Sequence, residues 1–158
     1  MLNQYRDVFR CLRKHDVRYV VIGGIAAVLH GVPRVTFDLD LLIQATEDNA
    51  SRLLKALREA GLGTASLTTT ERLLENEITI FKDRLRIDVQ TRTPGLEFDL
   101  AWEQRESMQH QDEEFHVVCV SDLIASKVAC GREVDLSDVA VLRDLNSGSA
   151  LDSGNDLR

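Results

Sequence analysis

Cysteine is scarce in this sequence, with three residues among 158, and their positions exclude two kinds of site. Cys11, Cys119 and Cys130 do not have zinc-site spacing, and they suggest no disulfide framework. We therefore expect free thiols in a reducing cytoplasm. A long hydrophobic run is also missing: no apolar stretch approaches the roughly 20 residues that span a bilayer, and the first residues lack a signal-peptide pattern. The sequence thus predicts a cytoplasmic protein with no membrane partner.

A surplus of positive charge is missing as well. The formal net charge is −7, which argues against tight nucleic-acid binding over the whole surface but leaves room for a local basic patch. Apolar residues make up 44% of the chain, enough to build the core of one domain. We expect this domain to cover residues 1–146. Residues 147–158, rich in Asn, Ser, Gly and Asp, predict a polar, disordered tail.

The most informative stretch covers residues 19–43. It opens with an apolar, β-branched run that predicts a buried strand and stops at Gly23 and Gly24. A short helical segment follows, and a second strand then begins with Asp38 and Asp40. Without side chains in the way, the backbone of a Gly-Gly turn ahead of a helix can approach a phosphate closely.

The two aspartates of this stretch indicate a metal ion. Side chains two residues apart on a strand project from the same face, so Asp38 and Asp40 stand together while Leu39 faces the core. Neighbouring carboxylates repel, and one takes up a proton unless a cation lies between them. A divalent ion with oxygen ligands, Mg²⁺ or Mn²⁺, is the simplest such cation. Each pattern alone also occurs in ordinary turns and solvent-facing strands, but together they favour a metal–nucleotide site.

The remaining patterns predict an α/β (α+β) fold, a mixed β-sheet with flanking helices. Residues 78–89 predict a hairpin whose second strand places Asp88 on the same face as Arg86 and Gln90. Residues 62–75 leave a short strand and a helical turn open as alternatives. Helices are expected at 3–15, 25–30, 47–60, 97–107, 123–130 and 136–145, strands also at 78–81, 85–89 and 115–120, and a polar turn at 109–114.

The stretch over residues 19–43 resembles the nucleotidyltransferase superfamily typified by DNA polymerase beta. Its signature is a Gly-Gly or Gly-Ser pair after a strand and, roughly a dozen residues later, an Asp-x-Asp motif. Here Gly23-Gly24 is followed by thirteen residues and then by Asp38-Leu39-Asp40. Residues 34–40, Arg-Val-Thr-Phe-Asp-Leu-Asp, look like the Arg-x-Thr-x-Asp-x-Asp variant of small bacterial stand-alone nucleotidyltransferases, including the abortive-infection type IV toxins. The resemblance implies a minimal nucleotidyltransferase fold.

The resemblance also implies which residues form the site. The catalytic carboxylates, which would hold Mg²⁺ or Mn²⁺, are Asp38, Asp40 and, on the neighbouring strand, Asp88. The residues that would bind the NTP substrate are Gly23, Gly24, Arg34, Thr36 and Lys127. A second segment matches a pattern of the toxin-like branch at Lys127, Arg132, Asp135 and Asp138. The alternative for the two acids is structural: Asp135 caps a helix, and Asp138 complements its dipole.

The implied activity is metal-dependent transfer of a nucleoside monophosphate from an NTP to a hydroxyl group of a macromolecular acceptor, a tRNA or a protein. One setting consistent with the resemblance is a toxin–antitoxin system, with a cognate antitoxin or partner subunit. Larger relatives add a C-terminal acceptor-binding domain for which this chain is too short, so we expect another molecule to present the acceptor. The alternative is a non-catalytic, nucleotide-binding regulatory partner in a two-component system, against which the three intact carboxylates argue. A Rossmann-type dinucleotide domain is disfavoured because no G-x-G-x-x-G motif occurs.

Overall fold

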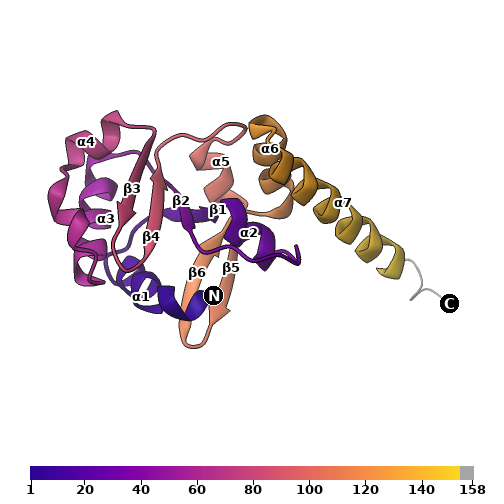
Figure 1. The fold of residues 1–158 in the computed structure, drawn as a ribbon, viewed down its shortest axis with the longest axis horizontal. Helices are drawn as coiled ribbons and strands as arrows, with labels where there is room; N and C mark the ends of the chain where they lie inside the picture. The colour runs from indigo at the N-terminus through magenta and orange to yellow at the C-terminus, as the bar shows by residue number, and fades with distance from the viewer. Residues whose placement is uncertain (154–158) are drawn as a thin grey trace.

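The computed structural model describes residues 1–153 and confirms the α/β fold, a mixed sheet flanked by helices (Figure 1). The sheet has six strands in the order β3-β4-β2-β1-β6-β5. Their bounds are β1 (Tyr19–Ile22), β2 (Leu39–Ile43), β3 (Ile78–Lys82), β4 (Arg86–Gln90), β5 (Glu106–His110) and β6 (Glu113–Val117). The predicted buried strand is β1, whose four residues are all buried.

The pairing of the central strands positions the residues that the sequence singled out. β1 pairs antiparallel with β2 and parallel with β6, and β2 pairs parallel with β4. The outer strands β3 and β5 form antiparallel hairpins with β4 and β6. In this register Asp40 lies between Ile22 of β1 and Asp88 of β4. Strand pairing alone therefore brings the Gly-Gly turn, which follows Ile22, next to two carboxylates.

Helices cover both faces of the sheet, with α1, α3 and α4 on one side and α2, α5 and α6 on the other (Figure 1). The last helix, α7, packs against α6 at its start and then extends away from the rest of the fold. No helix within residues 1–153 combines the length and apolar composition that crossing a membrane requires. The helical bounds are η1 (Leu2–Tyr5), α1 (Arg6–Lys14), α2 (Gly23–Leu29), α3 (Glu47–Glu59), η2 (Gly63–Leu67), α4 (Thr70–Glu75), α5 (Phe98–Glu103), α6 (Val120–Cys130) and α7 (Glu133–Ser153).

The first helical segment is fixed to the sheet by its apolar stripe. Tyr5, Val8, Phe9 and Leu12 are all buried, as their spacing along a helix predicts. The ring of Phe9 stacks on the ring of Phe115 in β6, with the centroids 4.5 Å apart. This packing holds the N-terminal helices against the strands and leaves the basic side chains of α1 outside the core.

Several predicted elements in the second half of the chain are wrong. The helix expected at 97–107 ends at Glu103, the strand expected at 115–120 is β6 but begins at Glu113 and ends at Val117, and the turn expected at 109–114 shrinks to the tight turn between β5 and β6. β5 escaped prediction because four of its five residues are polar or charged and none is fully buried. Within residues 62–75 the helical turn is confirmed as α4, and no strand forms.

The last helix also differs from its prediction. It begins at Glu133, three residues before the expected start, and continues to Ser153, well past the expected end at 145. The predicted domain boundary at 146 and the disordered tail over 147–158 stay predictions, since residues 154–158 lie outside the described part of the chain.

Candidate functional site

Three carboxylates lie on neighbouring strand segments, at the start of β2 and in the middle of β4. Asp40 and Asp88 are direct neighbours in the parallel pair, and Asp38 comes immediately before β2. All three line one cavity of about 370 Å³. Their exposure differs: 47% of the Asp38 side chain is exposed but only 14% of the Asp88 side chain. Asp38 therefore lies nearer the solvent-exposed mouth of the cavity, and Asp88 lies deeper inside it.

The electrostatics of Asp40 show that this cluster lacks positive charge. Burial raises the pKa of Asp40 from 3.8 to about 7, and the negative charges of Asp88 and Asp38 contribute in the same direction. The cations Arg132 and Arg86 oppose the shift but do not cancel it. Near neutral pH Asp40 is therefore protonated for a large part of the time, as expected for a buried carboxylate whose negatively charged neighbours outweigh the nearby cations.

Arg86 is a site residue whose role the sequence did not reveal. Its Nε lies 2.9 Å from Oδ1 of Asp88, its Nη2 lies 3.1 Å from Oδ2, and Nε is also 3.6 Å from Oδ2 of Asp38. The alternation of β4 placed Arg86 on the face of Asp88, and that signal could have suggested the ion pair. Arg86 thus occupies both carboxylate oxygens of Asp88. Within residues 1–153, no three Asp, Glu, His or Cys side chains are arranged closely enough to hold a metal ion as they stand.

The Gly-Gly turn lies directly against the carboxylates. Gly23 has a φ of +68°, and a Cβ at this position would lie 2.4 Å from Oδ2 of Asp40. A Cβ on Gly24 would lie 2.8 Å from Oγ1 of Thr36 and 3.1 Å from Nη2 of Arg34. The start of α2 can therefore contact these three side chains only because both residues are glycine.

Replacing Gly23 by alanine should damage the fold and the site together. The positive φ strains any side chain, and the added Cβ collides with the Asp40 carboxylate. We expect Gly23→Ala to lower the free energy of unfolding by about 2–3 kcal/mol, measured by urea denaturation. The matched control is Gly63→Ala, because a Cβ there meets no atom within 4 Å. Its effect should stay within about 0.5 kcal/mol, and equal losses in the two variants would contradict this account of the turn.

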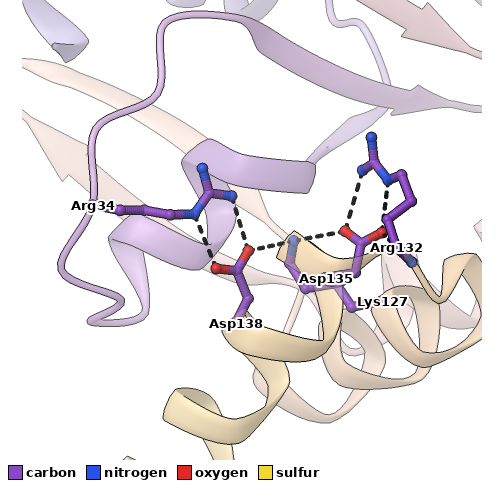
Figure 2. Close-up of polar contacts among 5 residues, drawn as sticks. All are labelled: Arg34, Lys127, Arg132, Asp135 and Asp138. Atoms are coloured by element: carbon purple, nitrogen blue, oxygen red, sulfur yellow. Dashed lines mark hydrogen bonds and ion pairs between the residues drawn. The ribbon is translucent and has the colours of Figure 1, made fainter.

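A chain of ion pairs links the loop after α2 to the two C-terminal helices (Figure 2). Arg34 contacts Asp138 through two hydrogen bonds, of 2.9 and 2.8 Å. The Nζ of Lys127 lies 2.8 Å from Asp138 and 3.5 Å from Asp135. Asp135 in turn binds Arg132, whose Nε is 2.7 Å from Oδ2. Three cations face two carboxylates, so the cluster has a net positive charge.

The inner members of this cluster are buried. Lys127 is 4% exposed, Asp135 1% and Asp138 2%, which excludes a solvent-facing role for the lysine. Burial alone would raise the pKa of Asp138, but hydrogen bonds from Arg34 and Lys127 outweigh it and lower that pKa. Asp135 also accepts a hydrogen bond from the backbone N–H of Arg132, as an acid in the first turn of a capped helix does. Asp135 is therefore not the N-cap itself, since α7 begins at Glu133, but from the first turn it binds the backbone N–H of the residue before the helix and also forms ion pairs.

Almost every residue predicted for the site lies on the same cavity. Asp138 instead lies behind Arg34 and Lys127 and lines an adjoining cavity of about 560 Å³, while Thr36 contacts Gly24. Trp102 lines another cavity, and the guanidinium of Arg105 lies 3.7 Å from its ring centroid. The predicted residues that line the site cavity are Gly23, Gly24, Arg34, Asp38, Asp40, Asp88, Lys127, Arg132 and Asp135.

Comparison with known proteins identifies the family of this chain. A family model described as "Nucleotidyltransferase of unknown function (DUF6036)" matches residues 3–146, which include every residue of the cavity and of the ion-pair cluster. No curated protein matches the chain.

Proposed function

Since the chain belongs to this family of nucleotidyltransferases, we propose that it transfers a nucleoside monophosphate from an NTP to a hydroxyl group of a tRNA or a protein. The observation that carries the proposal is the direct pairing of Asp40 with Asp88 beside the Gly23 turn, in one cavity with Lys127. The bond formed joins the acceptor oxygen to the α-phosphorus, and the bond broken releases pyrophosphate. Such a transfer needs positioning and charge neutralisation more than covalent chemistry from the protein.

The residues at the cavity fit a divalent metal ion, Mg²⁺ or Mn²⁺. Asp38, Asp40 and Asp88 would hold it, because carboxylate oxygens are the ligands that these hard cations prefer. The raised pKa of Asp40 supports this assignment, because burial and, after it, the negative charges of Asp88 and Asp38 disfavour a charged Asp40 that a cation would stabilise. When bound, the ion stabilises charge on the transferring phosphoryl group and lowers the pKa of the attacking hydroxyl.

The chain's own side chains supply the remaining steps of the proposal. Asp88 accepts the proton of the acceptor hydroxyl at a carboxylate oxygen, which requires that Arg86 release that oxygen. Arg34 and Lys127 offer positive charge to the triphosphate, and Asp138 holds both of them in place. Arg132 extends the same positive field toward Asp40.

Transfer of label from α-phosphate-labelled NTPs tests the proposed function. With Mg²⁺ and a cell extract as acceptor source, the wild type should label material that either ribonuclease or protease removes. Asp88→Asn should bind Mg·NTP within a few-fold of the wild type in calorimetry, yet transfer label at least about a hundredfold more slowly, the range of a lost general base. Binding of NTP without any labelling by the wild type would instead support a non-catalytic regulatory partner.

The proposal includes a toxin–antitoxin setting, supported by the resemblance of residues 34–40 and of the segment from Lys127 to Asp138 to the toxin-like branch. Induced synthesis of the wild type should then arrest growth of a bacterial host, and Asp88→Asn should not. Growth unaffected by a chain that labels its acceptor would remove the toxin role and leave the enzymatic one.

A further inference from the structure

Tyr5 lies directly behind the carboxylate cluster. It is the last residue of η1 and is fully buried in the core. Its hydroxyl donates a hydrogen bond to the backbone carbonyl of Phe37 and lies 3.3 Å from the backbone carbonyl oxygen of Arg86. Phe37 immediately precedes Asp38, and Arg86 lies two residues before Asp88. One hydroxyl thus touches the backbone of both segments that carry the carboxylates.

The segment before β2 has little apolar packing of its own. Val35 is 74% exposed and Phe37 70%, so neither side chain anchors the segment in the core. The polar contacts that hold it include the ion pair of Arg34 with Asp138, the hydrogen bond from Tyr5 to Phe37 and the 3.6 Å ion pair of Arg86 with Asp38. The position of Asp38 therefore depends on these tethers.

We propose that Tyr5 is a positioning residue that sets the spacing of Asp38 relative to Asp88. Tyr5 does not line the site cavity, so it acts through the backbone and not by contact with substrate. The part of this inference that concerns metal binding rests on the proposed function. The hydroxyl keeps its proton at working pH, because burial, followed by the negative charge of Asp38, raises the pKa of Tyr5 to about 12.

Removing the hydroxyl alone tests the inference. Tyr5→Phe keeps the ring and deletes one neutral hydrogen-bond donor, whose loss changes an equilibrium constant by up to about tenfold. With Mn²⁺ alone as the probe, we expect calorimetry to show an affinity about five- to tenfold weaker than that of the wild type. In label transfer kcat should fall by a similar factor, while KM for the NTP stays within about twofold.

Tyr19→Phe is the matched control. Tyr19 is also buried, and it lies at the end of β1 away from Gly23. This variant loses the same hydroxyl group from a buried ring, but it should leave Mn²⁺ affinity within about twofold. An unchanged Mn²⁺ affinity in Tyr5→Phe, or an equal loss in Tyr19→Phe, would overturn the positioning role.

Amide hydrogen exchange in the metal-free protein separates this inference from the proposed function. Tyr5→Phe should speed exchange in residues 34–40 about five- to tenfold, and Tyr19→Phe should leave that segment unchanged. If the wild type binds no Mn²⁺ and transfers no label, the proposed function fails, but exchange in 34–40 still decides whether Tyr5 holds this segment. Unchanged exchange there in Tyr5→Phe would overturn the inference on its own.

Discussion

Asp40→Asn should lower nucleotidyl transfer by at least about a thousandfold and, in the same protein, stabilise the metal-free fold at neutral pH. In the proposed function, the loss of transfer follows because a neutral amide would replace a charged oxygen that would hold the metal ion. The gain in stability follows from removing a buried carboxylate that Asp88 and Asp38 repel. A catalytic deficit coupled to a stability gain is what distinguishes a site residue from a structural one.

The raised pKa of Asp40 determines how the free energy of unfolding changes with pH. The folded protein binds the Asp40 proton more tightly than the unfolded chain, since the pKa rises from 3.8 to about 7. The stabilising contribution is complete below about pH 4 and is lost as pH rises to about 7. In EDTA, urea denaturation of the wild type should therefore show a contribution of about 3 kcal/mol lost between about pH 5 and pH 7.5.

Two comparisons make this prediction decisive. Asp40→Asn should lack that part of the pH dependence, whereas Asp112→Asn, whose side chain is 93% exposed, should retain it and transfer label normally. In the wild type, Mg²⁺ binding should displace the Asp40 proton, so its affinity should increase with pH up to about 7. Wild-type transfer by Asp40→Asn would remove this carboxylate from the metal site.

Lys127→Met should have the largest effect on stability. Lys127 is buried between Asp138 and Asp135, and its loss leaves both carboxylates short of a cation. Removing one partner of a buried ion pair costs about 3–5 kcal/mol, which urea denaturation would measure. Lys55→Met, on the exposed face of α3, is the matched control and should change stability by less than about 0.5 kcal/mol. A loss below about 1 kcal/mol for Lys127→Met would contradict the buried network.

A second variant separates the structural from the nucleotide-binding role of Lys127. Adding Asp138→Asn to Lys127→Met removes a stranded carboxylate and should recover part of the stability. NTP affinity should stay roughly ten- to a hundredfold weaker than in the wild type, because an ammonium–phosphate contact worth about 1.5–3 kcal/mol is still absent. If the double variant recovered both stability and NTP affinity, Lys127 would have a structural role only.

Local patterns in the sequence were sufficient to predict the centre of the cavity. Gly23 and Gly24 end an apolar run, Asp38 and Asp40 share a strand face, and the alternation of β4 points Asp88 the same way. Each of these signals lies within a few residues, where the period of a strand fixes the direction of a side chain. That β2 and β4 are parallel neighbours, so that Asp40 meets Asp88, came from the resemblance and not from spacing.

The partners of the charged side chains could not be predicted from local patterns. Asp138 binds Lys127 and, through both carboxylate oxygens, Arg34, and the pairing with Arg34 depends on how α7 packs. Arg86 shared a strand face with Asp88, yet periodicity gives a face and not a contact. β5 was missed for a related reason: a strand with few apolar residues has no periodic hydrophobic signal.

The ion pair of Arg34 with Asp138 joins residues that are 104 positions apart in the chain. During synthesis from the N-terminus, the segment from Gly23 to Asp88 leaves the ribosome well before Asp138 does. The carboxylate half of the cavity can therefore begin to fold while the half lined by Arg34 and Lys127 still lacks the residue that orients both of them. The order of translation thus delays assembly of the complete cavity until the first turns of α7, which carry Asp135 and Asp138, have been made.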